Sequence, residues 1–466
     1  MNRPQRRLFG TDGVRAPYGT PPLDRATITA LAAALGRTLA RRTNGAAPEV
    51  VIGGDTRAST PEICRWVAAG LATAGAAVRY VGTVPTPAVA YLTRRLAAAA
   101  GVVVSASHNP LPDNGVKLID AGGGKWSEEA EAALEAEFEA AAAPLPEAEH
   151  HALTADGDAV DLYLGHLAAG LPAGDGGGPP ETAPLAGLSL ALDAANGAAS
   201  PFARTLFERL GATVTALCDR PDGGNINHGC GSTHPERLAA AVAAGGHDLG
   251  FAFDGDADRA LLVDETGAVR DGDAMLYLWA RWLRGEGMLE PPVIVATSMS
   301  NLGLERALAA AGIGVVRCGV GDREVVETLR REGLVLGGEQ SGHLVDLALS
   351  TTGDGLLTAL HIACRVARER RASGATVSAL LAGFRRFPQV LFNVRVTAKP
   401  RLDALPAVAA VARRVEQSLG RDGRLVLRYS GTEPLARVMI EGPDQGEIER
   451  LAAELVAAID REIGAG

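Results

Sequence analysis

The sequence lacks the excess of positive charge that a nucleic-acid-binding protein carries. Its 466 residues include 45 Lys and Arg against 55 Asp and Glu, which gives a formal net charge of −10. Binding to a phosphate backbone requires a broad basic surface, so this balance argues against a nucleic-acid partner. A small phosphorylated substrate remains open, because a few local arginines are enough to hold it.

Cysteines are few and show no pairing pattern. The five of them are scattered, with no CxxC pair, at positions Cys64, Cys218, Cys230, Cys318 and Cys364. That spacing disfavours both a zinc site and a disulfide scaffold, and it fits a reducing compartment.

Long apolar runs are also missing. No uncharged stretch reaches the ~18–20 residues that a membrane-spanning helix needs. The basic residues among the first seven positions have no apolar segment behind them. We therefore expect a cytoplasmic protein without membrane contact, divided by its length into roughly three or four domains.

Strand and helix signals alternate along most of the chain. Short apolar runs such as Val50 to Gly53 and Leu249 to Phe253 predict strands, and segments such as Ala26 to Arg42 predict helices between them. This alternation indicates α/β units with mainly parallel sheets, and the similar size of three successive units suggests diverged duplication. The last portion predicts a small α+β domain. We place the four domains at residues 1–155, 156–267, 268–384 and 385–466.

The loop around Ser107 presents a hydroxyl at the end of a predicted strand. Val102 to Val104 lead into Ser105-Ala-Ser-His-Asn-Pro110, where the proline excludes a regular helix. We expect Asn114-Gly115 to form a turn that leads into a second strand. Ser107 is thus a candidate phosphoryl acceptor or nucleophile, with Lys117 close in sequence. An ordinary Ser-Asn-Pro turn has the same local signature.

A second loop, Asp254-Gly-Asp-Ala-Asp-Arg259, carries three carboxylates at alternate positions between two apolar strands. Such carboxylates can turn their oxygens onto one hard cation, which suits Mg²⁺. A calcium EF-hand loop is an alternative, and Glu265 occupies its twelfth position. However, Arg259 replaces the required glycine and the flanks predict strands. A solvated acidic turn is disfavoured by the apolar strands on both sides.

The stretch Gly337 to His343 combines a carboxylate, an amide, a hydroxyl and an imidazole on a glycine-rich loop. Glu339 as acceptor and Ser341 as donor or acceptor suit sugar hydroxyls. The alternative is a polar surface loop, and His343 on its own is more often structural than catalytic.

A fourth loop, in the last domain, runs from Arg428 to Pro434 and is followed by Arg437. The two arginines can bind phosphate oxygens, and Ser430, Thr432 and the Gly431 amide can donate further hydrogen bonds. No GxxxxGK[ST] phosphate loop occurs in this context, which disfavours an ATP-dependent kinase.

Taken together and in this order, the loops resemble those of the α-D-phosphohexomutases over nearly the whole chain. The matching motifs are Phe9-Gly-Thr-Asp-Gly-Val-Arg15, Asp55-Thr-Arg57, Ser105 to Pro110, Asp254 to Arg259, Gly338 to His343 and Arg428 to Pro434. Ala16, Gly54 and Tyr429 depart from the residues usual in the family. None of these departures removes a metal ligand or the acceptor serine.

The resemblance implies a fold of three α/β domains of similar topology plus a smaller C-terminal α+β domain, with the active site in the central cleft. Within the family, three features resemble those of the members that act on glucosamine phosphates: Gly338-Glu-Gln-Ser341, Asn225-Ile-Asn227 with Cys230-Gly-Ser-Thr233, and Thr351 to Gly355. They imply interconversion of glucosamine 6-phosphate and glucosamine 1-phosphate, on the route to UDP-N-acetylglucosamine. A homodimer is implied as well. The alternatives are a mutase for mannose and glucose phosphates, a metal-dependent phosphatase and a non-catalytic sugar-phosphate sensor.

The resemblance also implies a mechanism in which Ser107 carries a covalent phosphate. Its phosphate oxygen joins Asp254, Asp256 and Asp258 around one Mg²⁺ per subunit. The phosphoryl group passes to the sugar, and the bound 1,6-bisphosphate turns around and returns its other phosphate to Ser107.

The resemblance assigns the remaining roles to residues on the other loops. Arg428, Ser430, Thr432 and Arg437 hold the phosphate that is not reacting, and Glu339 and Ser341 bind the sugar. Arg15 and Arg259 steady the reacting phosphate. Lys117 is the first candidate for general acid or base and His343 the second, although spacing alone assigns neither.

Overall fold

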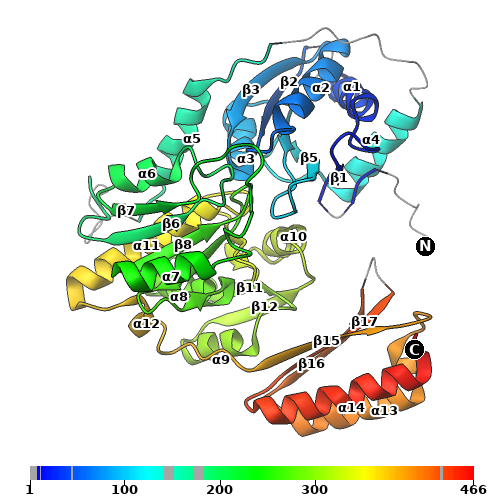
Figure 1. Ribbon diagram of the computed structural model, residues 1–466, viewed down its shortest axis with the longest axis vertical. Coiled ribbons are helices and arrows are strands. Elements are labelled where there is room, and N and C mark those ends of the chain that lie inside the picture. The colour runs from blue at the N-terminus through cyan, green and yellow to red at the C-terminus, as the bar shows by residue number, and fades with distance from the viewer. Residues whose placement is uncertain are drawn as a thin grey trace. The chain divides into compact units, whose positions relative to one another are not determined.

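Four β-sheets organise the described part of the chain in the computed structural model (Figure 1). The structure describes residues 8–10, 12–42, 46–140, 152–172, 182–430 and 434–465. Two compact units separate: Met1–Met299 with Val315–Ala382, and Ser300–Gly314 with Gly383–Gly466. The first unit contains three of the sheets and the second contains the fourth.

The first sheet has five strands in the order β1-β5-β4-β2-β3. Its domain consists of β1 (Val14–Pro17), α1 (Arg25–Arg42), β2 (Glu49–Gly54), α2 (Thr60–Thr73), β3 (Ala77–Thr83), α3 (Thr86–Arg95), β4 (Ala100–Val104), β5 (Asp113–Asp120) and α4 (Glu128–Ala140). Helices α1, α2 and α4 cover one face of the sheet, where Ile52 and Val102 join their core, and α3 covers the other (Figure 1). The domain is therefore a three-layer α/β/α structure.

The second sheet also has five strands, in the order β10-β9-β8-β6-β7. Its elements are α5 (Gly157–Ala169), β6 (Ser189–Asp193), α6 (Ala203–Arg209), β7 (Thr213–Leu217), α7 (Glu236–Gly245), β8 (Leu249–Phe253), β9 (Ala260–Asp264) and β10 (Val269–Arg270). The third sheet has the order β12-β11-β13-β14. Its elements are α8 (Gly272–Gly285), β11 (Val293–Thr297), β12 (Gly314–Cys318), α10 (Asp322–Glu332), β13 (Leu336–Gly338), β14 (Leu344–Asp346), α11 (Gly355–Ser373) and α12 (Val377–Leu380).

The three sheets repeat one topology. Numbered along the chain within each domain, the four shared strands stand in the order fourth, third, first, second: β5-β4-β2-β3, β9-β8-β6-β7 and β14-β13-β11-β12. In every domain the loop from the third strand to the fourth carries a predicted functional motif. These loops contain Ser107, Asp254 to Asp258 and Glu339 to His343, respectively. Repetition of the fold thus supplies three different chemical groups from equivalent positions.

The second unit is smaller and has a single antiparallel sheet in the order β15-β17-β16. Its elements are α9 (Leu302–Ala310), β15 (Gln389–Arg395), a 3₁₀ turn at Leu402–Ala404, α13 (Pro406–Leu419), β16 (Arg424–Tyr429), β17 (Leu435–Glu441) and α14 (Gln445–Ile463). Helices α13 and α14 bury the apolar side chains of one face of this sheet.

The predicted fold class, three α/β domains of similar topology and a smaller C-terminal domain, is confirmed. The prediction of mainly parallel sheets is wrong in part, because β5 and β9 pair antiparallel with both of their neighbours. The predicted turn at Asn114-Gly115 is also wrong. Both residues lie inside β5, where they pair with Ala16 and Arg15 of β1.

The domain boundaries at residues 155, 267 and 384 stay a prediction. No helix in the described part of the chain is long and apolar enough to cross a membrane.

Candidate active site

Ser107 lies at the carboxyl end of the first sheet with its hydroxyl directed at the second domain. Its Oγ donates a hydrogen bond to Asp254 Oδ2 over 2.6 Å, and its backbone N–H donates to Ser105 Oγ over 2.9 Å. The side chain is buried, and the backbone has a φ of 52°, in the left-handed region that non-glycine residues seldom occupy. Such a conformation persists only where the surroundings hold it.

Arg57 is the residue that holds this loop. Its guanidinium has no solvent exposure and lies 3.0 Å from Asp55 Oδ2. The remaining donors reach backbone carbonyls of the serine loop, at 3.2 Å for Ser107, 2.8 Å for Asn109 and 2.8 Å for Pro110. A rigid fork with five N–H donors suits such a set of acceptors. The Asp55-Thr56-Arg57 motif is visible in the sequence, but its function there could not be predicted.

The second domain supports the same loop from the opposite side. Asn227 Nδ2 donates to the Ser107 carbonyl over 2.8 Å, and Thr56 Oγ1 donates to the Asn196 carbonyl over 2.5 Å. Gly255 packs so closely that a Cβ there would lie 2.4 Å from the Ser107 carbonyl oxygen. Only glycine allows this approach, so the Asp254-Gly255-Asp256 sequence is shaped to fit against the serine loop.

Asp254, Asp256 and Asp258 form a buried cluster of carboxylates. Their oxygens lie within 4.8 Å of one another, and Asp256 Oδ1 and Asp258 Oδ1 have no hydrogen-bond partner among the described residues. Burial raises the pKa of Asp254 well above its usual value, and the negative charges of Asp258 and Asp256 add to this shift. Buried carboxylates are commonly paired with or coordinate cations, and the oxygens of this cluster that lack hydrogen bonds can hold a metal ion.

Lys117 is buried beside this cluster. Its Nζ lies 2.7 Å from Asp256 Oδ2 and 3.1 Å from Asp12 Oδ2. Burial alone would lower the pKa of the lysine, but the carboxylates of Asp12, Asp256 and Asp258 outweigh it and raise that pKa. The Thr86 hydroxyl donates to the same Asp256 oxygen over 2.6 Å. Lys117 is therefore a fixed cation at neutral pH.

Asp12 connects Lys117 to the third domain. It forms ion pairs with Lys117, Arg15 and Lys125, and Lys125 in turn pairs with Asp322 at the start of α10. The positive charges of these partners lower the pKa of Asp12, although burial acts against them. Asp12, Lys125 and Asp322 were not predicted as site residues, because they come from three separate segments without a shared motif.

The loop of the third domain forms the turn between β13 and β14. His343 is buried there, with Nε2 3.8 Å from Asp322 Oδ2, and neither ring nitrogen has a hydrogen-bond partner among the residues that the structure describes. Ser341 Oγ is likewise buried without a partner in that set. Burial raises the pKa of Glu339, although His343 and Arg259 act in the opposite direction. The loop thus offers unsatisfied polar atoms to a ligand.

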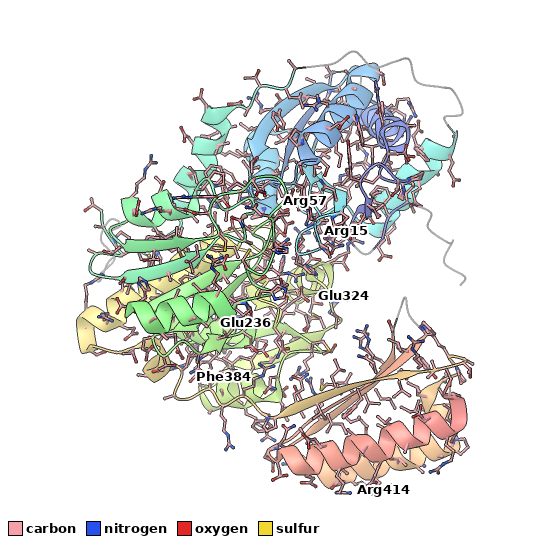
Figure 2. All side chains as sticks on the ribbon, in the orientation of Figure 1. Arg15, Arg57, Glu236, Glu324, Phe384 and Arg414 are labelled. Carbon is pink, nitrogen blue, oxygen red and sulfur yellow. The ribbon has the colours of Figure 1, made fainter. Side chains whose placement is uncertain are left out.

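Two arginines lie near the serine and aspartate loops: Arg15 is in β1, and Arg259 is the last residue of the aspartate loop before β9. Arg15, labelled in Figure 2, donates through Nη1 to Asn109 Oδ1 over 3.2 Å. Arg259 donates its backbone N–H to Asp254 Oδ1 over 3.3 Å, and its Nε lies 3.7 Å from Asp258 Oδ1. Burial alone would lower the pKa of Arg259, but the neighbouring carboxylates of Asp258 and Asp254 outweigh it and raise that pKa. Arg259 Nε has no hydrogen-bond partner among the described residues, whereas Arg15 is already held by Asp12 and Asn109.

The predicted phosphate-binding residues all belong to the second unit. Arg428 and Arg437 are direct cross-strand partners on β16 and β17. Ser430 follows β16, its carbonyl accepts a hydrogen bond from Lys399 Nζ over 2.7 Å, and its N–H donates to the Leu435 carbonyl. Gly431 and Thr432 lie outside the described residues.

Four models of one family match the chain in the order of these domains. They are described as phosphoglucomutase/phosphomannomutase alpha/beta/alpha domain I over residues 6–144, domain II over 180–267, domain III over 271–387 and the C-terminal domain over 391–458. The chain belongs to the phosphoglucomutase/phosphomannomutase family.

Individual relatives in this family carry a more specific name. A phosphoglucosamine mutase of Rhodococcus erythropolis is 48% identical over 455 residues, which cover 97% of this chain and 99% of the relative. A phosphoglucosamine mutase of Solibacter usitatus is 46% identical over 461 residues, covering 98% and 99%. The predicted resemblance to the phosphohexomutases, and with it the prediction of an enzyme, is confirmed.

Among solved structures, a phosphoglucomutase/phosphomannomutase family protein of Burkholderia thailandensis has the same fold. It superposes with a TM-score of 0.77 at 26% identity, covering 97% of this chain and 96% of that protein.

Proposed function

We propose that this enzyme interconverts glucosamine 6-phosphate and glucosamine 1-phosphate through phosphorylated Ser107 and a bound glucosamine 1,6-bisphosphate. The observation that carries the proposal is the 2.6 Å contact from Ser107 Oγ to Asp254 Oδ2, at the edge of a three-carboxylate cluster. The names of the relatives at 46% and 48% identity support an amino sugar as substrate. The product would feed the synthesis of UDP-N-acetylglucosamine.

The aspartate cluster suits Mg²⁺. All of its ligand atoms are oxygens, which hard cations prefer, and two of them are buried without a hydrogen bond among the described residues. Asp254, Asp256 and Asp258 would hold the ion, with Ser107 as the fourth ligand through its phosphate. When bound, Mg²⁺ neutralises negative charge on the phosphoryl group during transfer.

Ser107 alternately gives and receives a phosphoryl group. In the first transfer the bond from phosphorus to Ser107 Oγ breaks, a bond from the sugar hydroxyl oxygen to phosphorus forms, and the hydroxyl proton passes to a base. After the bisphosphate turns around, the second transfer reverses these changes at the other sugar position. Arg57 keeps Ser107 in place throughout, since it binds the serine carbonyl and not the reacting oxygen. Arg15 and Arg259 would supply positive charge to the reacting phosphate.

The two candidates for general acid or base differ in their contacts. Lys117 is held as an ammonium between two carboxylates, which is the protonated form that a donor to Ser107 Oγ needs. The same carboxylates raise its pKa and oppose release of that proton, so its positive charge also serves to stabilise Ser107 Oγ when the phosphate leaves. His343 has neither ring nitrogen hydrogen-bonded within the described residues, so it suits acceptance of the sugar proton. Glu339 and Ser341, on the same loop, would bind the sugar hydroxyls.

The phosphate that is not reacting would be held by the second unit. Arg428 and Arg437 stand directly opposite each other, and like charges in that arrangement repel. A phosphate between them would relieve the repulsion and accept bidentate hydrogen bonds. Ser430, Gly431 and Thr432 would donate the remaining hydrogen bonds.

Coupled assays on glucosamine 1-phosphate, glucose 1-phosphate and mannose 1-phosphate test the substrate. We expect the highest kcat/KM on glucosamine 1-phosphate, with Ser107→Ala as the blank. A higher kcat/KM on either neutral sugar would overturn the proposal. Steady release of inorganic phosphate, without transfer between sugar positions, would indicate a phosphatase instead.

A further inference from the structure

A second group of potential metal ligands lies in the second domain, separate from the aspartate cluster. It consists of Asp193, Cys218 and Cys230, whose carboxylate oxygen and sulfur atoms all lie within 4.8 Å of one another. Asp193 and Cys230 are buried, and Cys218 is half-buried. The scattered cysteine positions disfavoured a metal site in the sequence, but the fold brings two of the five together beside a carboxylate.

Backbone N–H groups orient Asp193, and Cys218 has an unusual backbone conformation. Asp193 ends β6, where Oδ1 accepts the Ala195 N–H over 2.9 Å and Oδ2 accepts the Gly231 N–H over 3.0 Å. The Cys218 thiol adds a side-chain hydrogen bond to this carboxylate, and hydrogen bonds of this kind orient ligating carboxylates. Cys218, directly after β7, has a φ of 49°, which is costly for a residue with a side chain.

Both thiols keep their protons when no cation is present. Burial raises the pKa of the Cys230 thiol to about 12, and the Asp193 carboxylate and the neighbouring Cys218 contribute to this shift. Burial and Asp193 also raise the pKa of Cys218, whose sulfur accepts a contact from Arg237 Nη1 at 3.6 Å. Two sulfur atoms and a carboxylate oxygen within 4.8 Å of one another are ligand atoms that suit a thiophilic divalent cation, which would displace the thiol protons on binding.

The spacing agrees with such an ion. Zinc–sulfur bonds of about 2.3 Å in tetrahedral geometry separate two sulfur ligands by ~3.8 Å, within the 4.8 Å limit of this group. We propose that Asp193, Cys218 and Cys230 bind one thiophilic divalent cation of the zinc class, with the fourth position open to solvent beside Cys218. Binding releases two protons, one from each thiol.

The bound ion would join the two ends of the loop between Cys218 and Cys230. That loop contains Asn227, which donates to the Ser107 carbonyl, and Gly223, whose carbonyl accepts the Ala58 N–H over 3.0 Å. A cation at its base would therefore stabilise the loop that supports Ser107. The site does not depend on which sugar the enzyme uses.

Cadmium alone is the probe, because cadmium–thiolate bonds give an ultraviolet charge-transfer band. The reduced full-length protein is titrated with Cd²⁺ in excess Mg²⁺, which keeps the aspartate cluster occupied. We expect a band that saturates at one equivalent and is lost in Cys218→Ser and in Cys230→Ser. Cys318→Ser, at another half-buried cysteine, is the matched control and should keep the full band.

A band that survives Cys218→Ser would overturn the proposal, as would the absence of a saturable band in the unmodified protein. A chain isolated two mass units light, with Cys218 linked to Cys230, would replace the metal site by a disulfide. Serine is close in size to cysteine, and urea unfolding verifies that each variant folds. If Cys230→Ser fails to fold, the test relies on the absorbance band of Cys218→Ser, because Cys218 is only half-buried. Because absorbance does not require turnover, failure here is distinguishable from failure of the proposed function.

Discussion

Arg57→Lys tests whether the serine loop is held by one buried guanidinium. Arg57 binds Asp55 and the backbone carbonyls of Ser107, Asn109 and Pro110 at 2.8–3.2 Å, all from a side chain without exposure. A lysine keeps the charge beside Asp55, but a single ammonium cannot reach acceptors that surround a planar fork. The variant therefore removes the geometry and retains the charge.

The expected loss follows from the number of bonds. We expect lysine to lose at least two hydrogen bonds, and a bond from a charged donor contributes ~1.5–3 kcal/mol. The free energy of unfolding should then fall by about 3–5 kcal/mol. Ser107 would also lose its fixed position, and misplacement of a reacting group by about 1 Å costs on the order of 10²-fold in kcat.

Urea unfolding and mutase turnover measure the two effects separately. Arg65→Lys, at an exposed position on α2 of the same domain, is the control and should change stability by no more than about 0.5 kcal/mol. If Arg57→Lys unfolds at the same urea concentration as the unmodified protein and keeps its kcat, Arg57 does not hold the loop.

Three further variants examine the metal cluster, a buried carboxyl and the histidine. Asp256→Asn should weaken Mg²⁺ binding by at least on the order of 10²-fold in calorimetric titration, and unchanged affinity would place the ion elsewhere. Burial raises the pKa of Asp354 to about 6, from an ordinary value of 3.8. The folded chain therefore keeps a proton that the unfolded chain loses, and the free energy of unfolding falls as pH rises between these values. Asp354→Asn should remove this pH-dependent contribution of up to ~3 kcal/mol. If the free energy of unfolding of the variant changes with pH just as that of the unmodified protein does, the assignment to Asp354 is wrong. Gly353→Ala would place a Cβ 2.4–2.5 Å from the His343 ring. It should lower kcat more than it changes KM, and an unaltered kcat would exclude His343 from proton transfer.

Local patterns predicted the parts of the fold that local chemistry determines. The β-branched run Val102 to Val104 forms β4, and the alternate carboxylates from Asp254 to Asp258 form one cluster. In contrast, β1 is short and follows a glycine-rich segment, and it becomes a strand only through pairing with β5. Asn114-Gly115 was predicted to be a turn because its pairing with β1 is not visible in the local sequence. Pairing with a distant segment decides such stretches, and no local signal reports it.

The site was predictable where one loop carries the chemistry and not where several segments meet. Ser107 and the three aspartates each stand out within six residues of sequence. Asp12 and Lys125 acquire their importance from each other and from Asp322, which the chain brings together from separate segments. Lys117 was predicted as a general acid or base, but its two carboxylate partners, and so its fixed charge, are visible only in the structure.

The most direct test of the phosphoryl-transfer mechanism is to locate the phosphate on the protein during turnover. The enzyme is incubated with glucosamine 1,6-bisphosphate and Mg²⁺, quenched and mapped by peptide mass spectrometry. We predict one phosphate, on Ser107. In Ser107→Ala we predict no phosphate and no turnover, with urea unfolding still cooperative. Phosphate on another residue, or undiminished turnover of Ser107→Ala, would contradict the proposal that Ser107 carries the phosphoryl group.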